Sequence, residues 1–243
     1  MPVALEKRVL GLIGEVIGLL DVYEFCDGLM RALREALPSD WCAINEVPAD
    51  LPHTMSLTDP PVPIGIHEAF ARYGIQNPIA AHFISTGEGG ATRFSDLITR
   101  RQLHRLELYQ HVYKPLNAEY QIAFTLPSGS VRVLGVALSR SRRDFTARER
   151  DLLNLARPYL IQNYRNALAY SEQHGSPQLP LSALQALGLT RRQAQVLRLV
   201  ARGNTSREAA AKLGIAPRTA QKHLEHCYRT LNVTSRSEAS QLA

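Results

Sequence analysis

Four short helices, each with its own start signal, are encoded in the last quarter of the chain. Three segments match the capping box, in which a hydroxyl and the side chain three residues later satisfy free amides of the first helical turn. They are Thr190-x-x-Gln193, Thr205-x-x-Glu208 and Ser235-x-x-Glu238. Gly214 marks a helix end and Pro217 the start of the next helix. The pattern predicts helices over about 191–202, 206–213, 217–231 and 236–242.

The third of these helices is expected to have one buried and one exposed face. Apolar residues recur on it at helical spacing, which predicts a buried stripe: Ala220, Leu224, Cys227 and Leu231. We expect this stripe to pack on apolar residues of the two preceding helices, namely Val196, Leu197, Val200, Ala210 and Leu213. The other face is polar and basic and holds Arg218, Gln221, Lys222, Glu225 and Arg229. Two helices joined by a short turn, the second with such a face, have the geometry that places a helix in the major groove of DNA.

Charge is distributed unevenly along the chain. From Leu179 onward ten Lys and Arg stand against three Asp and Glu, a net charge of +7, whereas the preceding residues carry 18 against 19. A basic segment beside a neutral one indicates a polyanion-binding domain joined to a different module. The length of 243 residues also favours two domains. We expect them at 1–170 and 181–243, with a Gly- and Pro-containing linker at 171–180.

The C-terminal segment resembles the LuxR/GerE-type helix-turn-helix over about 55 residues. The resemblance is carried by Leu189-Thr190-x-Arg192-Gln193-x-Gln195-Val196-Leu197, Gly203, Glu208-Ala209-Ala210, Leu213-Gly214-Ile215, Thr219, His223, Tyr228, Leu231-x-Val233, Ser235-Arg236 and Glu238-Ala239. It implies a bacterial transcription regulator that binds double-stranded DNA, usually as a homodimer, with RNA polymerase as a candidate partner. Its base-facing positions are Gln221, Lys222 and Glu225.

Contacts to DNA phosphates are predicted separately from those to the bases. Hydroxyls, amides and guanidinium groups near helix N-termini suit phosphate oxygens. The candidates, together with one arginine on the polar face of the third helix, are Thr205, Arg207, Arg218, Thr219, Arg229 and Arg236. Ala216 stands where this family usually has a hydroxyl cap, so the third helix has a weaker N-cap. This difference leaves the predicted fold intact and the operator sequence open.

The first 170 residues predict an α+β domain. Helices are expected over 3–20 and 21–37, a strand over 41–47, then a Pro-rich loop and helical pieces at 66–73 and 100–113. Two strands, 121–126 and 131–139, are expected to form a hairpin around 127–130, and Thr146 caps a last helix that runs to about Tyr170, bent at Pro158. Helices around a modest antiparallel sheet indicate a GAF-like sensor and dimerisation domain.

Aromatic residues of this domain are numerous enough to line a ligand pocket. The candidate lining residues are Trp41, Phe83, Tyr109, Tyr113 and Gln121. Two roles stay open for the domain, binding of an unknown small-molecule effector and ligand-free dimerisation through protein contacts. A quorum-sensing receptor is a further alternative, although the Trp, Tyr and Asp pattern expected for acyl-homoserine-lactone binding is not evident.

The remaining function classes find little support in the residues. No acid/base pair, nucleophile or metal-ligand spacing stands out, so we expect neither an enzyme nor a metal or other cofactor. An adaptor that binds only proteins would not require the basic C-terminal segment. Three scattered cysteines, without a signal peptide or an apolar run long enough for a membrane span, indicate a cytoplasmic protein.

Overall fold

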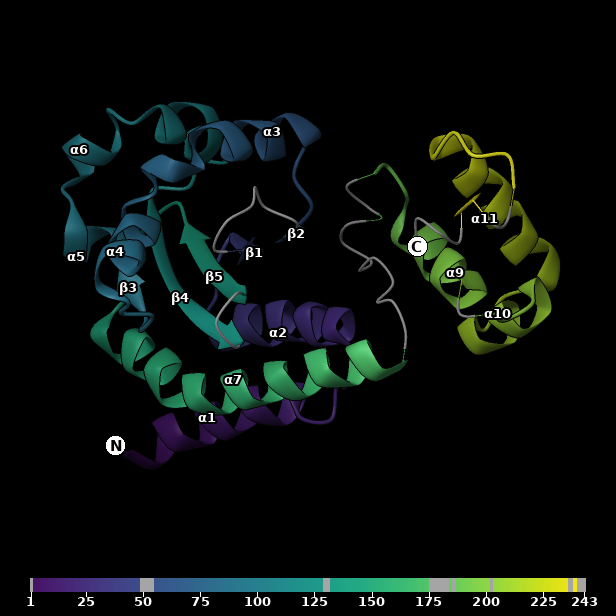
Figure 1. The fold of residues 1–243 in the computed structure, drawn as a ribbon, viewed down its shortest axis with the longest axis horizontal. Coiled ribbons are helices and arrows are strands. Elements are labelled where there is room, and N and C mark those ends of the chain that lie inside the picture. Colours follow the sequence, from purple (N-terminus) through teal and green to yellow (C-terminus); the bar gives the residue numbers. More distant parts are fainter. Residues whose placement is uncertain are drawn as a thin grey trace. The chain divides into compact units, whose positions relative to one another are not determined.

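The chain folds as two compact units, Met1–Gln173 and His174–Ala243, and each is described by itself (Figure 1). The computed structural model describes residues 2–48, 55–128, 132–174, 184, 187–201, 203–235 and 238–239. Residues 171–174 of the predicted linker are helical, because no Gly or Pro lies between Pro158 and Gly175 to end the last helix of the first unit earlier. Residues 175–180 of that linker lie outside the described residues.

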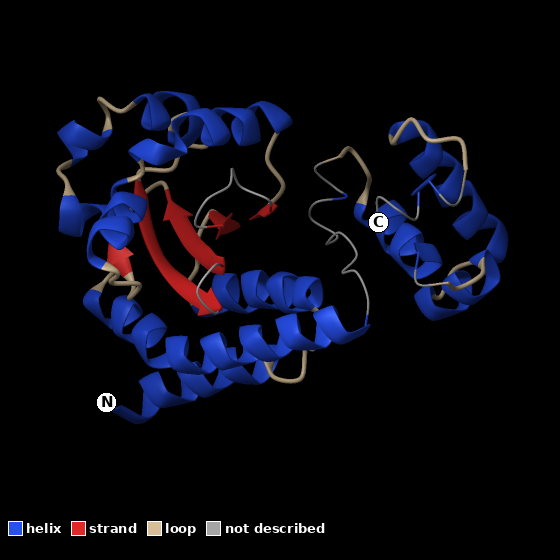
Figure 2. Ribbon diagram, viewed as in Figure 1, coloured by secondary structure: helices blue, strands red, loops and turns tan. Residues whose placement is uncertain are grey.

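A five-stranded antiparallel sheet forms the centre of the N-terminal unit, as the α+β prediction requires (Figure 2). Its strands in spatial order are β2 (Met55–Asp59), β1 (Trp41–Pro48), β5 (Arg132–Arg140), β4 (Tyr120–Ser128) and β3 (Thr92–Arg93). The predicted β4–β5 hairpin is confirmed, with Thr125 opposite Gly135. Residues 129–131, which include part of the expected turn, lie outside the described residues. The edge strands β2 and β3 were not predicted, because both are short and β2 lies in the Pro-rich segment that was read as loop.

Three long helices cover one face of this sheet: α1 (Pro2–Val16), α2 (Val22–Ala36) and α7 (Ala147–His174) (Figure 2). The first ends four residues earlier than predicted, because Gly18 has a left-handed φ of 83°. Asp21 caps α2 through its carboxylate, which accepts from the amides of Tyr23 and Glu24 at 3.0 and 2.9 Å. Phe25 of α2 stacks on Tyr164 of α7, with ring centroids 5.9 Å apart. Aromatic packing therefore joins two of the three helices.

A buried ion pair attaches the start of α7 to strand β5. Arg140 Nη2 lies 2.5 Å from Glu149 Oε1, and the two side chains are only 6% and 11% exposed. The Arg140 guanidinium also donates to the carbonyl oxygen of Pro38 at 2.7 Å and lies 3.9 Å from the ring centroid of Phe145. Glu149 in turn accepts from the amide and hydroxyl of Thr146, which completes the predicted capping box. One carboxylate thus satisfies both the helix start and the buried cation.

Short helices cover the opposite face of the sheet. They are α3 (Ile64–Tyr73), η1 (Gly74–Gln76), α4 (Pro78–Thr86), α5 (Phe94–Leu97), α6 (Arg100–Leu103) and η2 (Tyr109–Tyr113). The helical pieces predicted at 100–113 are α6 and η2, which are separated by a break at residues 104–106. The Gln76 side chain accepts from the amide of Leu108 at 3.0 Å and so satisfies a backbone donor after the break. The second piece then winds more loosely, since the amide of Lys114 donates to the carbonyl of Tyr109.

The C-terminal unit contains the predicted helices α9 (Arg191–Ala201), α10 (Ser206–Leu213) and α11 (Pro217–Thr230). The first two capping boxes are confirmed at Thr190 and Thr205. The third differs, because Glu238 accepts from the amide of Thr234 rather than from that of Ser235, although the Ser235 hydroxyl still accepts from the amide of Glu238. Most of the predicted fourth helix, 236–242, lies outside the described residues. Among the described helices, none has the length and apolarity that a membrane span needs.

Candidate DNA-reading helix and sensor cavity

Helix α11 has the two faces that the sequence predicts. Ala220, Leu224 and Cys227 are buried in a cluster with apolar side chains of α9 and α10. The opposite face is solvent-exposed and carries Arg218, Gln221, Lys222, Glu225 and Arg229. With 3.6 residues per turn, these five positions fall within an arc of about 100°. Three of them are the predicted base-reading residues, so those three side chains lie together on one exposed surface.

The turn before α11 is fixed by backbone geometry rather than by a side-chain cap. Gly214 has a left-handed φ of 63°, and its amide donates to carbonyls of the last turn of α10. Ala216 is the extended N-cap residue and provides no capping oxygen, as expected, while Pro217 occupies the first helical turn. Arg192 of α9 donates to the carbonyl oxygen of Leu213 at 2.7 Å. This arginine therefore ties α9 to the end of α10, a role that its position in the motif did not reveal.

The predicted phosphate-binding residues lie at different helix ends. Thr205 is exposed, but its hydroxyl already accepts from the amide of Glu208 and donates to the carboxylate of that residue. Arg207 is exposed in the first turn of α10, and Arg218 and Thr219 are exposed in the first turn of α11. Arg229 lies in the last turn of α11. Arg236 lies outside the described residues.

Cys227 belongs to the core of this unit. Its Sγ lies 3.5 Å from the carbonyl oxygen of Gln193, to which the thiol donates. Burial raises the pKa of the Cys227 thiol to about 12, so the thiol is neutral at physiological pH. Because thiolate is the form that binds metals and reacts with electrophiles, this residue contributes packing between α9 and α11.

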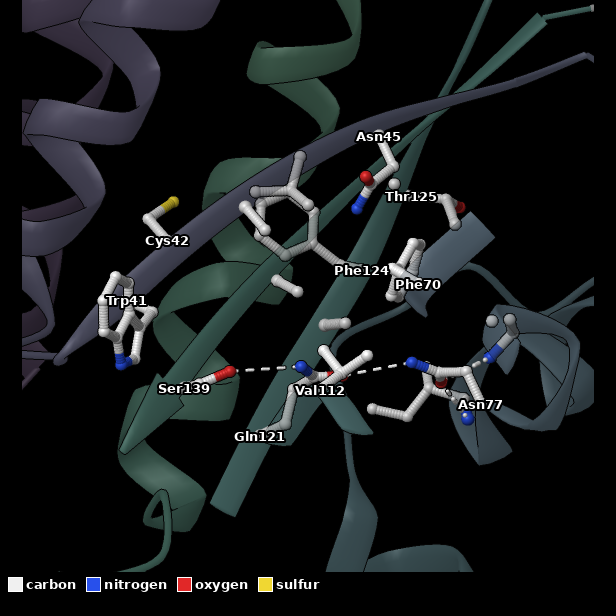
Figure 3. A pocket seen from close by; sticks show the side chains of 18 of the residues that line it. Trp41, Cys42, Asn45, Phe70, Asn77, Val112, Gln121, Phe124, Thr125 and Ser139 are labelled. Atoms are coloured by element: carbon white, nitrogen blue, oxygen red, sulfur yellow. Dashed lines mark hydrogen bonds between the residues drawn. The ribbon is translucent and has the colours of Figure 1, made fainter. Parts of the chain in front are cut away.

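A cavity of about 480 Å³ opens between the sheet of the N-terminal unit and helices α3 and α4 (Figure 3). Its size is typical of small-molecule sites, which range from about 300 to 1,000 Å³. Four of the five predicted pocket residues line it: Trp41, Phe83, Tyr113 and Gln121. Tyr109 lies outside the lining and instead donates to Glu119 Oε1 at 2.5 Å. Burial and this hydrogen bond raise the pKa of Tyr109 to about 12.

Strand alternation explains which residues reach this cavity. Side chains alternate between the two faces of a strand. On β1, β4 and β5 the even-numbered side chains from 42 to 44, 122 to 126 and 134 to 138 are 0–2% exposed, and three of these residues, Cys42, Phe124 and Val136, are also among those that line the cavity. Their odd-numbered neighbours form three rows across β1, β5 and β4: Trp41–Ser139–Gln121, Ala43–Ala137–Ala123 and Asn45–Gly135–Thr125. The floor of the cavity is thus made of small residues between two rows that contain polar ones.

A chain of hydrogen bonds crosses one end of the cavity. Asn77 caps α4 with its side-chain oxygen, which accepts from the amides of Ile79 and Ala80 at 2.9 and 3.1 Å. Its nitrogen donates to the hydroxyl of Tyr113 at 2.9 Å and to Gln121 Oε1 at 3.4 Å. Gln121 Nε2 donates to Ser139 Oγ at 3.1 Å (Figure 3). Burial is the main cause of the raised pKa of Tyr113, so its hydroxyl stays protonated.

Sequence reasoning missed most of this arrangement. Asn77 precedes Pro78 and is recognisable as an N-cap, but α4 was not predicted, so nothing placed the residue near β4. Ser139 was assigned to a strand without a role. The small floor residues carry a signal that could have been used, since Ala43, Ala123, Gly135 and Ala137 occupy alternate strand positions between large buried residues.

Helix α7 reaches the loop at the rim of this cavity from the other side of the sheet. Asn154 Oδ1 accepts from the amide of Ala91 at 2.8 Å, and Arg157 Nε donates to the carbonyl oxygen of Thr125 at 2.8 Å. Burial lowers the pKa of Arg157 from its usual range. Gly89 packs against the side chains of Thr125 and Arg157. A Cβ placed at Gly89 would lie 2.0 Å from Thr125 Oγ1 and 2.6 Å from Arg157 Nη2. The glycine therefore permits close contact between the rim loop, β4 and α7.

Comparison with known proteins identifies the C-terminal segment. Residues 187–243 match GerE, the family of bacterial regulatory proteins described as the luxR family. No curated protein sequence matches the chain significantly. The match spans the same three helices that carry the buried stripe and the exposed face of α11.

Solved structures with similar folds include three from bacterial proteins. The LBD domain of VqsR from Pseudomonas aeruginosa has a TM-score of 0.53 at 19% identity, over 65% of this chain and 95% of that domain. CepR2 of Burkholderia cenocepacia, an N-acylhomoserine lactone dependent LuxR family transcription factor, has a TM-score of 0.49 at 11% identity, over 68% of this chain and 98% of that chain. SdiA of Escherichia coli has a TM-score of 0.45 at 15% identity, over 98% of this chain and 96% of that chain. At these identities the VqsR comparison supports the fold of the N-terminal unit, and the other two carry no further argument.

The predicted resemblance is therefore confirmed where it was specific. The three described helices, the left-handed Gly214 and the exposed face of α11 all lie within the matched range. Residues 187–243 form a helix-turn-helix domain of the GerE type, the domain described for bacterial regulatory proteins of the luxR family.

Proposed function

We propose that this protein is a sequence-specific transcription regulator that binds DNA as a homodimer and whose affinity for DNA depends on a small molecule bound in the N-terminal cavity. The observation that carries the DNA-binding part is the exposed arc of α11, where Gln221, Lys222 and Glu225 lie over a buried stripe. Amide, ammonium and carboxylate groups in such an arc match adenine, guanine and cytosine edges in the major groove. A transcription regulator that binds chromosomal DNA acts in the bacterial cytoplasm. RNA polymerase is the protein that such a regulator would recruit to a promoter or exclude from it.

Roles within the helix-turn-helix divide between bases and backbone. Lys222 and Gln221 lie where a helix inserted into the groove meets base edges, so they set the preferred sequence. Arg207 and Arg218 are exposed in first helical turns, where a cation and free amides together bind phosphate. A dimer follows from the geometry of recognition, because one helix reads only a few base pairs and two copies related by a two-fold axis read a palindrome.

Selection of binding sites from random duplex DNA by the full-length protein tests this proposal. We expect a palindromic consensus, and affinity that falls steeply with salt. Lys222→Ala should cost about 1–3 kcal/mol on the selected site and relax the base preference at one position of each half-site. Arg207→Ala should weaken binding to all DNA sequences alike. It should also reduce the slope of log affinity against log salt concentration by about 1.

Lys114→Ala provides the charge-matched control, because Lys114 is exposed in the N-terminal unit and the one hydrogen bond given for its ammonium group among the described residues goes to the side chain of Gln110. This variant should leave affinity and preference unchanged. A Lys222→Ala protein that selects the original sequence with unchanged strength would contradict the assignment of the reading face. An asymmetric single half-site from the full-length chain would contradict the dimer.

A further inference from the structure

The cavity of the N-terminal unit has a floor that is wide and low. The three rows of side chains span four residues along each strand, about 13 Å, and the strands β1, β5 and β4 together span about 10 Å. The middle row is Ala43, Ala137 and Ala123, and the centre of the next row is Gly135. No side chain in this central area rises more than one carbon above the sheet.

Gly135 has no backbone reason to be glycine. Its φ is not in the left-handed region, and a Cβ placed there would make only an ordinary contact of 3.5 Å with the carbonyl oxygen of Asn45. What the missing side chain provides is space in the cavity. Protein interiors are close-packed and rarely leave such a space empty without reason, so the low floor points to an occupant as wide as the three strands.

The roof above this floor is apolar. Side chains from α3, α4 and η2 form it, including Ile66, Phe70, Ile79, Phe83 and Val112. An extended acyl chain is only one methylene wide and would leave most of the breadth of the floor uncovered. A planar ring system would contact floor and roof over its whole area, which is where dispersion and hydrophobic burial are largest.

The polar end of the cavity offers donors rather than acceptors. Both amide protons of Asn77 and the carbonyl oxygen of Gln121 are used in the hydrogen bonds described above. Among the described residues, the second amide proton of Gln121 and the hydroxyl proton of Ser139 have no such acceptor. These side chains are 5% and 6% exposed, and both line the cavity. A buried donor is costly without an acceptor, so this end selects a ligand oxygen that accepts.

Charge in the cavity is sparse, which bears on the net charge of the occupant. Among the described lining residues there is one carboxylate, Glu88, and one imidazole, His67, and no Lys or Arg. Burial lowers the pKa of His67, which keeps its ring neutral. The side chain of Glu88 is 75% exposed, and its carboxylate lies 3.4 Å from His82 Nε2. With no cation in the described lining, a ligand carboxylate would lose its hydration without gaining a counter-charge.

We propose that the cavity binds a neutral, planar molecule of two or three rings that lies flat on the Ala/Gly floor and places a carbonyl oxygen against Gln121 and Ser139. This proposal rests on the proposed function for its regulatory meaning, but its binding step can be tested alone. The floor determines the breadth of the ligand, and the polar end determines its orientation. The lack of a cation among the described lining residues determines its charge. The ligand class is therefore that of aromatic ketones and related ring carbonyls.

Trp41 allows this to be measured directly, because it is the single tryptophan of the chain and it lines the cavity. We would titrate the full-length protein with three probes and follow Trp41 fluorescence, corrected for absorption with free tryptophan. Flavone is a planar ring ketone, flavan lacks both the carbonyl and the planarity, and methyl decanoate is a neutral but linear carbonyl compound. The expected order of affinity is flavone first, with the other two at least threefold weaker.

Two variants separate the floor from the polar end. Ala137→Leu fills the centre of the floor and should reduce flavone affinity by at least tenfold, whereas Ala81→Leu, on the exposed side of α4 and outside the lining, should not change it. Ser139→Ala removes one hydrogen-bond donor. It should weaken the affinity for flavone by about 3- to 10-fold and leave the affinity for flavan unchanged. Thermal melting of each variant checks that it is folded.

Tighter binding of methyl decanoate than of flavone would overturn the planar-ligand proposal, as would flavone affinity unaffected by Ala137→Leu in a folded protein. Absence of any flavone binding up to its solubility limit would also overturn it. DNA binding of the same preparation, measured by fluorescence anisotropy without any probe, keeps the two proposals distinct. DNA binding without flavone binding refutes the ligand class alone, and the reverse result refutes the reading helix alone.

Discussion

The buried pair of Arg140 and Glu149 makes a quantitative prediction about how α7 is attached to the sheet. Glu149→Ala leaves the guanidinium of Arg140 buried with only the Pro38 carbonyl and the Phe145 ring as partners. Breaking a buried ion pair on one side costs about 3–5 kcal/mol. Loss of the capping box with Thr146 adds about 1 kcal/mol. We therefore expect Glu149→Ala to lower the free energy of unfolding by about 4–6 kcal/mol, a large share of the roughly 5–15 kcal/mol typical of a folded protein.

Arg140→Leu should cost less, about 3 kcal/mol, because Glu149 keeps its hydrogen bonds from Thr146. In the double variant no charge is left buried, so the combined loss should fall short of the sum by about 2–3 kcal/mol. Urea unfolding at pH 7, followed by the fluorescence of Trp41 on β1, reports this unit. Additive losses within about 0.5 kcal/mol would show that the two groups do not depend on each other and would refute the reasoning.

Three further outcomes follow from the structure. Ala216→Ser supplies the missing N-cap oxygen of α11 and should stabilise the C-terminal unit by about 1 kcal/mol, raising its Tm by about 4–8 °C in calorimetry; an unchanged Tm would contradict this. Burial alone would raise the pKa of Glu119, but hydrogen bonds from Tyr109, Arg100 and His104 lower it from 4.5 to about 2. Its stabilisation is therefore complete above pH 4.5 and lost as the pH falls toward 2, so the deficit of Glu119→Gln in urea unfolding should shrink from pH 6 to pH 3. Gly89→Ala should destabilise the N-terminal unit by about 1–3 kcal/mol, whereas Gly65→Ala, with open space at its Cβ, should not; equal melting curves would argue against the tight rim contact.

The sequence was most informative where local rules decide the structure. Capping boxes, the left-handed Gly214 and Pro217 depend on interactions within a few residues, so the three described helices of the C-terminal unit were predicted to within one or two residues. Helical periodicity predicted the exposed polar face of α11, and the resemblance to the LuxR/GerE type implied which positions on that face contact bases. The roles of Gln221, Lys222 and Glu225 toward DNA stay predictions, because exposure on one face does not by itself specify which base each contacts.

The fold of the N-terminal unit was predictable only in outline, because its details depend on contacts between distant residues. The helix expected over 100–113 breaks where Gln76, some thirty residues earlier, accepts from the amide of Leu108. The buried ion pair of Arg140 and Glu149 was not predicted, since nothing local shows that the Arg140 guanidinium meets the Pro38 carbonyl. Four of five aromatic and amide candidates line the cavity, but Asn77 and Ser139 required the strand register to be known.

The hydrogen bonds between α7 and the cavity rim connect the position of this helix to the conformation of the rim. This helix has 28 residues, about 42 Å in length, and it holds the loop through Asn154 and strand β4 through Arg157. Thr125 belongs to both sides, since its carbonyl is bound by α7 and its side chain lines the cavity. Anything that lifts Thr125 or residues 89–91 must also strain or release two hydrogen bonds of α7. Both hydrogen bonds come from the N-terminal half of α7, and the helix continues beyond them to His174. A displacement at the cavity rim would therefore be transmitted along α7 toward the segment that follows it.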